Sequence, residues 1–280
     1  MSGALPELVL DPGEVDRLYD AGKAVADSAA HMAGWTERSS EARSRLKGVL
    51  DEPYGPTREE YLDVFPGPPG GPVHVFIHGG YWRRFSARDF SFVAEPLVAA
   101  GHTVVIPNYA LCPHVRIGEI VRQMRAALHW IVNHADRHGG DVGRLTLSGH
   151  SAGGHLVGMM LATDWSGWRD MPPEPVRASV ALSGLYDLAP FAYSWLQPTL
   201  QLDHHEIERC SPVRLVRPQA TKLILAAGEQ ESPAFHAQAD RFAARWSACG
   251  NRVTQASPAG RDHFTILEDL PGLLARTEAG

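Results

Sequence analysis

Cysteine, long apolar runs and clusters of basic residues are scarce or missing in this chain of 280 residues. The three cysteines, Cys112, Cys210 and Cys249, stand far apart, which argues against a disulfide framework and a cysteine zinc cluster. No apolar stretch reaches the roughly 18 residues that span a membrane, and the first residues lack the basic and then apolar plan of a signal peptide. We therefore expect a cytoplasmic protein with no membrane partner. A net charge of −6 without a basic cluster also argues against nucleic acid as a partner.

The composition is that of an ordinary globular protein. Apolar residues make up 44% of the chain and charged residues 21%, and the length predicts one large domain over residues 1–280. Strand-like and helix-like segments alternate, which predicts an α/β fold with a mostly parallel central sheet and helices on both faces. The expected strands cover residues 73–77, 103–106, 145–147, 179–182, 223–226 and 252–254, and the expected helices cover residues 90–100, 118–134, 235–246 and 264–276.

Residues 1–66 precede this pattern and are predicted to form an N-terminal helical arm and the first strand. Asp11 is suited to cap a helix, Pro12 to occupy its first position and Glu14 to complete a capping box. A helix through about Ala33 is therefore expected.

Two connecting segments have a distinct composition. The run Gly67–Pro72 is rich in glycine and proline, and we interpret it as a tight hairpin loop before the first central strand. Residues 186–218 lie between two late strands, and their aromatic stretch Phe191–Leu196 makes this excursion a candidate lid.

The most informative motif is Gly149-His150-Ser151-Ala152-Gly153. An apolar strand enters it and a helix start rich in small residues leaves it, which is the sequence context of a nucleophile elbow. In such a turn a strained serine projects its hydroxyl from the sheet, and flanking glycines avoid clashes of a Cβ atom. Ser151 is therefore the predicted nucleophile, and the Ala152 amide is a predicted oxyanion donor.

A serine nucleophile needs a base and an acid, which follow it along the chain in this kind of fold. His263 lies between the last expected strand and the last helix, so we predict that it is the base. Glu229 and Glu231 lie in the loop after residues 223–226, where the acid is expected, and Asp187 follows the preceding strand. Loop position favours Glu231, with Glu229 and Asp187 as alternatives.

The segment His78-Gly79-Gly80-Tyr81-Trp82 follows the first central strand and is the predicted oxyanion loop. Its glycines let backbone amides approach a substrate carbonyl, and Gly80 and Tyr81 are the expected donors. His78, Gly79 and Trp82 are predicted to contact the substrate. We expect the bulky Tyr81 to narrow the acyl pocket and to favour a one-carbon acyl group.

Several other polar residues are left out of the predicted site. Arg83 and Arg84 could meet a substrate carboxylate, but charged residues after a turn are more often solvated. The run His204–Glu206 lacks a third ligand at helical spacing, so it is not predicted to bind a metal. His150 and His155 flank the serine and are interpreted as packing or positioning residues.

Taken together, these blocks resemble the kynurenine formamidase (arylformamidase) family of α/β-hydrolases, close to the hormone-sensitive-lipase-like esterases. The segment His78–Trp82 is similar to the oxyanion motif of that family. Glu231-Ser232-Pro233 stands where its members often have Asp-Ser-Pro, which leaves the identity of the acid open. The other similar blocks are Tyr54-Gly55, Leu62–Pro66, Asn108–Pro113, Gly149–His155, Leu182–Leu188 and Asp262–Phe264.

The resemblance implies an α/β-hydrolase fold and a serine hydrolase that cleaves N-formyl-L-kynurenine to L-kynurenine and formate, without a metal or a cofactor. Ser151 would attack the formyl carbon while His263 takes its proton. A short-acyl carboxylesterase with the same residues is the first alternative, and a non-catalytic binding protein of this fold is the second. A small-molecule substrate is the expected partner, and the sequence allows a homodimer.

Overall fold

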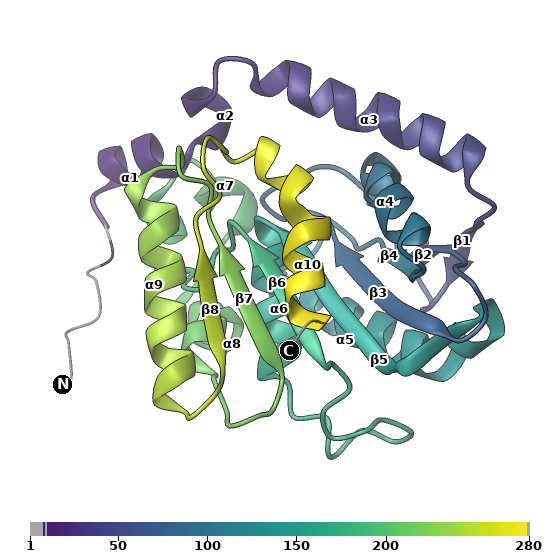
Figure 1. The fold of residues 1–280 in the computed structure, drawn as a ribbon. Helices are drawn as coiled ribbons and strands as arrows, with labels where there is room; N and C mark the ends of the chain where they lie inside the picture. The colour runs from purple at the N-terminus through teal and green to yellow at the C-terminus, as the bar shows by residue number, and fades with distance from the viewer. Residues whose placement is uncertain (1–7, 9, 279–280) are drawn as a thin grey trace.

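An eight-stranded, mostly parallel sheet forms the centre of the computed structural model, which describes residue 8 and residues 10–278. The strands are β1 (Val49–Pro53), β2 (Tyr61–Phe65), β3 (Gly71–Ile77), β4 (Thr103–Pro107), β5 (Gly140–His150), β6 (Ala178–Leu182), β7 (Lys222–Ala226) and β8 (Val253–Ala256). Their order across the sheet is β1-β2-β4-β3-β5-β6-β7-β8 (Figure 1). Every pair from β4 to β8 in this order is parallel, whereas β1 and β2 add antiparallel strands at one edge. The predicted α/β fold with a mostly parallel sheet is confirmed.

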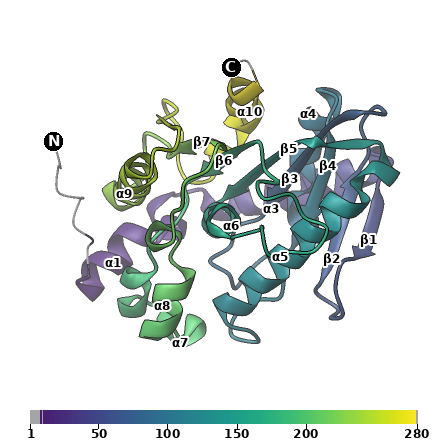
Figure 2. The same ribbon diagram turned by 90° about the horizontal axis from the view of Figure 1, so that it is seen from below.

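Helices cover both faces of this sheet. The α-helices are α1 (Pro12–Tyr19), α2 (Ala21–Ala24), α3 (Ser28–Arg45), α4 (Ala94–Ala99), α5 (Ile117–His134), α6 (Ala152–Ala162), α7 (Gln197–Leu200), α8 (His204–Cys210), α9 (Pro233–Ala248) and α10 (Leu270–Glu278). Short 3-10 helices are η1 (Ala87–Val93), η2 (Ala135–His138), η3 (Ala189–Tyr193), η4 (Pro212–Arg214) and η5 (Thr265–Asp269). Seen from below, α4 and α10 lie on one face of the sheet, and α5 and α6 lie on the other (Figure 2).

The central strands are apolar because they are covered on both sides. All five residues of β4 are buried, as are all five of β6, and a strand packed between two helical layers has no face for water. On α5, by contrast, apolar residues recur every three or four positions, so one stripe of the helix is buried against the sheet. These two patterns explain why the central strands and crossover helices could be predicted from the sequence.

The N-terminal arm is helical, but its helix is broken. Asp11 caps α1 as predicted and accepts the Glu14 amide at 3.0 Å. The expected single helix through about Ala33 is wrong, because the chain leaves helical geometry at Asp20 (φ −81°, ψ 73°). The Asp20 side chain accepts the Lys23 amide at 3.2 Å and so begins α2 as a new helix.

The run Gly67–Pro72 does not form a hairpin loop, and that prediction is wrong. It connects β2 to β3, which are not neighbours because β4 lies between them. The segment crosses the start of β4, where the Gly67 amide donates to Thr103 Oγ1 at 3.1 Å. The arm also contributes two strands, β1 and β2, where one was expected.

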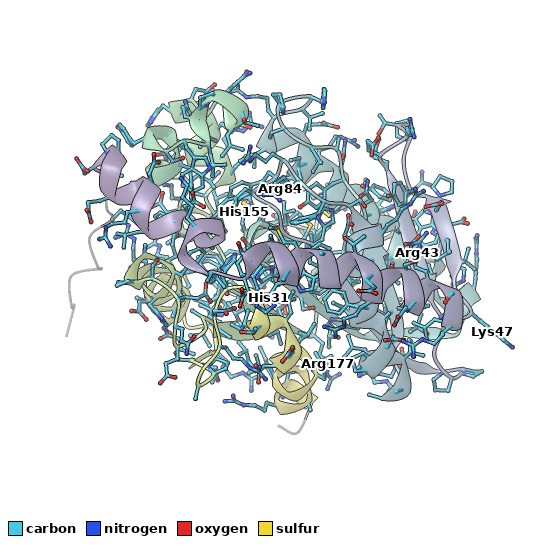
Figure 3. All side chains as sticks on the ribbon, turned by 90° about the horizontal axis from the view of Figure 1, so that it is seen from above. His31, Arg43, Lys47, Arg84, His155 and Arg177 are labelled. Carbon is cyan, nitrogen blue, oxygen red and sulfur yellow. The ribbon has the colours of Figure 1, made fainter. Side chains whose placement is uncertain are left out.

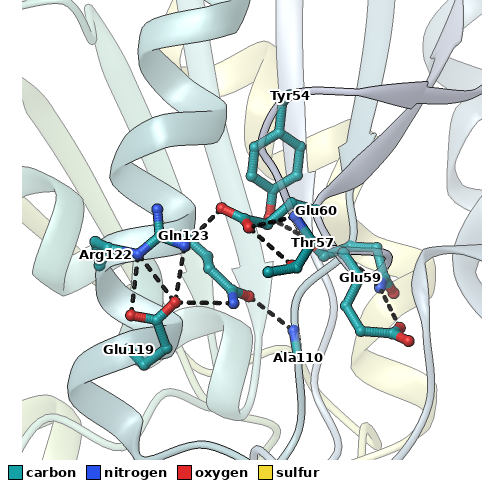
Figure 4. A network of polar contacts seen from close by, with 9 residues as sticks. Tyr54, Thr57, Glu59, Glu60, Ala110, Glu119, Arg122 and Gln123 are labelled. Atoms are coloured by element: carbon teal, nitrogen blue, oxygen red, sulfur yellow. Dashed lines mark hydrogen bonds and ion pairs between the residues drawn. The ribbon is translucent and has the colours of Figure 1, made fainter.

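A buried polar network ties the arm to the loop after β4 (Figure 4). The fully buried Glu60 carboxylate accepts Arg122 Nη2 of α5 at 2.5 Å and Thr57 Oγ1 at 2.8 Å. Burial acts to raise the pKa of Glu60, but these hydrogen bonds outweigh burial and hold the pKa below its usual value. On the same helix, Gln123 Oε1 accepts the Ala110 amide at 2.8 Å. The network thereby fixes the loop that follows β4.

The arm lies over the carboxyl ends of the parallel strands. Figure 1 shows α1, α2 and α3 beyond the arrowheads, and Figure 3 shows α3 crossing this edge when seen from above. In α/β folds this edge is where loops gather into a binding site. Within the described part of the chain, no helix is both long and apolar enough to cross a membrane.

Candidate active site

Ser151 occupies a strained turn between β5 and α6. Its backbone has φ 57° and ψ −117°, a conformation that costs free energy for a residue with a Cβ atom. The turn is possible because Gly153 has no side chain: a Cβ there would clash with the carbonyl oxygen of Ile77. The Ser151 amide donates to Leu182 O of β6 at 2.8 Å, which holds the turn on the sheet. This is the elbow geometry that the sequence predicted.

His263 and Glu231 form a buried pair beside the elbow. His263 Nδ1 lies 2.7 Å from Glu231 Oε2, and the side chains are 7% and 1% exposed. The other carboxylate oxygen, Oε1, accepts Ser183 Oγ at 2.5 Å and the Gly228 amide at 2.7 Å. Because an ionised carboxylate only accepts hydrogen bonds, it holds the proton on Nδ1 and leaves Nε2 of His263 free to accept one.

The alternative acids lie elsewhere. Glu229 Oε2 accepts the Gly260 amide at 2.8 Å on the surface. Asp187 is buried against two cations, with Oδ1 3.2 Å from Arg214 Nη2 and Oδ2 3.6 Å from Arg241 Nη2. Of the three candidate carboxylates, Glu231 is the one that contacts the imidazole of His263.

His150 positions the backbone of the base. Its Nε2 donates to the carbonyl oxygen of His263 at 2.7 Å. Burial lowers the pKa of His150 well below its usual value, and the neighbouring His263 lowers it further. His150 is therefore neutral and structural, as the sequence predicted for a positioning residue.

The oxyanion loop has an unusual backbone. Gly80, Tyr81 and Trp82 have φ values of 111°, 52° and 57°, and the Gly80 carbonyl accepts the Arg83 and Arg84 amides at 3.1 and 3.0 Å. Among the backbone hydrogen bonds of residues 8 and 10–278 outside helices and strands, none has the Gly80 or Tyr81 amide as donor. Both amides are therefore available to an acceptor that enters the pocket.

Three residues predicted to contact substrate prove to be buried supports of this loop. Trp82 is 0% exposed, and its Nε1 donates to Nδ1 of His155 at 3.2 Å. His78 is also 0% exposed and stacks on Tyr109 with ring centroids 4.1 Å apart. Burial lowers the pKa of both His78 and His155 to about 4, so both are neutral. None of His78, Gly79 and Trp82 lines the pocket, and the side chains of His78 and Trp82 are buried in the core.

A pocket opens over Ser151 and His263. Its walls are largely aromatic, as expected for a site that holds an apolar ring. Part of one wall comes from the arm, which the sequence did not connect with the site. The lining includes Asp20, Met32 and Trp35 from the arm, Tyr81, Arg83, Arg84 and Phe85 from the oxyanion segment and the residues after it, and Trp195 and Phe264 from later loops.

Three hydrogen bonds hold the arm in place over the pocket. The Tyr81 hydroxyl donates to the carbonyl oxygen of Tyr19, and the Ser232 hydroxyl donates to the carbonyl oxygen of Leu18. Asp16 Oδ1 accepts the Trp195 amide at 2.9 Å, so the arm also holds the excursion that contains η3. The candidate lid thus contributes Trp195 to the pocket, packed edge-on against Tyr81 at 5.8 Å.

Sequence reasoning also left out two arginines that line the pocket. Arg83 is half-buried, whereas Arg84 is exposed and extends its guanidinium to Met32 Sδ at 3.3 Å beside α3 (Figure 3). The sequence signal was present, since both follow the oxyanion motif directly. In the run His204–Glu206, the Glu206 carboxylate binds Arg116 Nε at 2.8 Å, and the described residues contain no cluster of three or more metal-binding side chains.

Comparisons with known proteins agree with this geometry. The BD-FAE family matches residues 68–245. The kynurenine formamidase of Salmo salar is 32% identical over 251 residues, which cover 86% of this chain and 83% of that protein. The kynurenine formamidase of Danio rerio is 30% identical over 249 residues, with the same coverage of each chain.

A solved structure gives the same result for the fold. The crystal structure of a candidate thioesterase from silicibacter sp. tm1040 superposes with a TM-score of 0.80, at 30% identity, over 92% of this chain and 94% of that one. The similarity therefore includes the arm as well as the sheet. On this evidence the chain is a hydrolase that belongs to the BD-FAE family and, among the α/β-hydrolases, to the kynurenine formamidase family.

Proposed function

We propose that this protein hydrolyses the formamide of N-formyl-L-kynurenine to L-kynurenine and formate. The observation that carries the proposal is the buried His263–Glu231 pair beside the strained Ser151, at the base of an aromatic pocket. Similarity to kynurenine formamidases over most of the chain supports the choice of substrate.

In the proposed mechanism, Ser151 Oγ attacks the formyl carbon while Nε2 of His263 accepts its proton. The carboxylate of Glu231 stabilises the resulting imidazolium through Nδ1–H. The amides of Gly80, Tyr81 and Ala152 donate to the oxyanion of the tetrahedral intermediate. The imidazolium then protonates the aromatic amine as the C–N bond breaks, and kynurenine leaves.

The second half of the reaction uses the same groups. His263 removes a proton from water as that water attacks the formyl-Ser151 ester, and a second tetrahedral intermediate collapses to formate and free serine. No group beyond these residues is needed for the proton transfers.

The proposal of a small acyl group rests on how close the oxyanion loop lies to the nucleophile. A Cβ on Gly79 would lie 3.2 Å from Cβ of Ser151 and 2.7 Å from the His150 carbonyl oxygen, so the two backbones nearly touch. Tyr81 is in addition held by its hydrogen bond to Tyr19. There is thus little space for a long acyl chain on that side of the serine.

The aromatic wall suits the leaving group. Trp35 and Phe264 contact each other with ring centroids 5.6 Å apart, and Phe85 meets Trp35 at 6.1 Å. All three line the pocket, and a flat apolar surface of this kind packs against an aromatic amine. A homodimer and a cytoplasmic location remain predictions.

The test is the ratio of kcat/KM for N-formyl-L-kynurenine to kcat/KM for p-nitrophenyl acetate and p-nitrophenyl butyrate. We expect the formamide to be preferred and the butyrate to be the poorest of the three. Ser151→Ala is the control for contaminating hydrolases and should abolish turnover of all substrates. A strong preference for the esters would refute the formamidase proposal and favour a short-acyl carboxylesterase.

A further inference from the structure

Arg83 is a half-buried cation of the pocket with an unpartnered donor. Its Nε atom is shielded from water and has no hydrogen-bond acceptor among the described residues. A buried donor without an acceptor costs about 1–3 kcal/mol, so each one calls for a physical explanation. The guanidinium lines the same pocket as Ser151 and His263.

The nearby anion is already engaged. Asp20 lines the pocket too, but its Oδ2 binds Lys23 Nζ at 2.9 Å and its Oδ1 accepts the Lys23 amide at 3.2 Å. Asp20 therefore has a partner of its own, and it does not pair with Arg83 in the described structure. No hydrogen bond or ion pair among the described residues engages the Arg83 guanidinium, so a ligand carboxylate in the pocket would be its anionic partner.

The backbone of Arg83 belongs to the oxyanion loop. Its amide donates to the Gly80 carbonyl at 3.1 Å and closes a short turn, with two residues between Gly80 and Arg83. In the proposed mechanism the amide of Gly80 faces the reacting carbonyl. A ligand held by Arg83 would consequently be oriented relative to the oxyanion site by one short turn. Arg84, in contrast, is exposed and extends over Phe85 and toward Met32.

We infer that Arg83 binds the α-carboxylate of the substrate's amino-acid tail and is the residue that selects an anionic leaving group. The inference rests on the proposed function, because a carboxylate-bearing leaving group is what a kynurenine substrate provides. The aromatic ring lies against Trp35 and Phe264, the formyl group lies at Ser151, and the tail extends to Arg83.

The experiment measures kcat/KM of the full-length protein on three substrates. These are N-formyl-L-kynurenine, its analogue in which hydrogen replaces the α-carboxylate, and p-nitrophenyl acetate. For Arg83→Met we expect a 10- to 100-fold loss on the first substrate, mainly through KM, and less than a threefold change on the other two. Arg83→Lys keeps the charge without the planar fork and should recover part of the loss.

A matched control is Arg88→Met. Arg88 is an exposed arginine of η1 that binds Asp51 at 2.8 Å and lies outside the pocket, so its loss should change no substrate by more than about twofold. Activity on p-nitrophenyl acetate shows in each variant that the protein has folded.

The outcomes separate this inference from the proposed function. Suppose that the wild-type protein prefers N-formyl-L-kynurenine, but Arg83→Met lowers kcat/KM equally for the analogue without a carboxylate. Arg83 then does not bind the carboxylate, and the inference is wrong. The same holds if Arg84→Met, rather than Arg83→Met, causes the carboxylate-dependent loss. If wild-type protein turns over neither formamide while it hydrolyses p-nitrophenyl acetate, the proposed function fails and the inference fails with it.

Discussion

Replacing Glu231 by glutamine should disable the proposed base, His263, by moving the proton of its neutral imidazole from Nδ1 to Nε2. In the wild-type protein Oε1 accepts two hydrogen bonds, from Ser183 Oγ and the Gly228 amide, and Oε2 faces Nδ1 of His263. In Glu231→Gln the carbonyl oxygen must stay with the two donors, because an amide NH₂ cannot accept from them. The NH₂ group then faces His263 Nδ1 and donates to it.

The consequence for catalysis follows from where the imidazole proton goes. A donor facing Nδ1 forces the neutral ring to carry its proton on Nε2, which then cannot take the proton of Ser151. The equivalent carboxylate-to-amide change in serine proteases costs about 10⁴-fold in kcat, or about 5 kcal/mol of transition-state stabilisation. We expect a loss of this size in kcat with a much smaller change in KM.

The assay is steady-state turnover of N-formyl-L-kynurenine, followed by the absorbance of kynurenine. Glu229→Gln is the matched control, since Glu229 lies in the same loop but accepts the surface amide of Gly260. It should retain activity within about twofold of wild type, as most surface substitutions do. Ser183→Ala removes one of the two donors that fix the amide, so the double variant with Glu231→Gln should regain part of the lost activity.

Two results would refute this reasoning. Activity of Glu231→Gln within tenfold of wild type would show that the carboxylate does not orient the base. A severe loss in Glu229→Gln or Asp187→Asn, with unchanged far-UV circular dichroism, would move the acid to that residue.

Three further predictions concern other parts of the molecule. Gly153→Ala places a Cβ against the Ile77 carbonyl oxygen, so the free energy of unfolding, measured in urea, should fall by about 3 kcal/mol; an unchanged value would contradict the tight elbow. Trp195→Ala removes one aromatic wall, so KM for N-formyl-L-kynurenine should rise about tenfold, while kcat/KM for p-nitrophenyl acetate stays within about threefold. Burial lowers the pKa of His74 to about 3 and that of His78 and His155 to about 4, whereas the value in the unfolded chain is near 6.5. Unfolding therefore takes up protons, and the free energy of unfolding should fall as the pH falls from about 6.5 to 4. The slope is steepest near pH 5, at just under about 4 kcal/mol per pH unit. Urea unfolding between pH 7 and pH 5 that showed no such decline would argue that these histidines are not buried and neutral.

The sequence predicted those features that are determined over a few residues. Strands such as β4 and β6 are buried on both sides and so appear as short apolar runs. The elbow is readable because the backbone approach at Gly153 excludes every larger residue. The loop positions of Glu231 and His263 follow from the order of strands and helices along the chain.

Features that depend on distant contacts, or on a local choice that the sequence leaves open, were not predicted. The helix of the arm breaks at Asp20 because a side-chain cap competes there with the helical hydrogen bonds, and the same residue type can also sit within a helix. The position of β4 between β2 and β3 depends on pairing of strands far apart in the sequence. Trp35 reaches the pocket only because α3 lies across the carboxyl ends of the strands.

Chemistry and specificity in this fold therefore have different physical origins. The proposed nucleophile, base and acid are held by bonds within the core, among them Ser151 to β6 and Glu231 to the Gly228 amide. Part of the pocket wall comes instead from the arm, which is joined to later loops by hydrogen bonds such as that from the Trp195 amide to Asp16. Weakening an arm contact should then alter which leaving group is accepted while the acyl chemistry at Ser151 continues. This division fits the similarity of the chain to both kynurenine formamidases and esterases: the nucleophile determines that an acyl group is transferred to serine, and the pocket wall determines which leaving group is accepted.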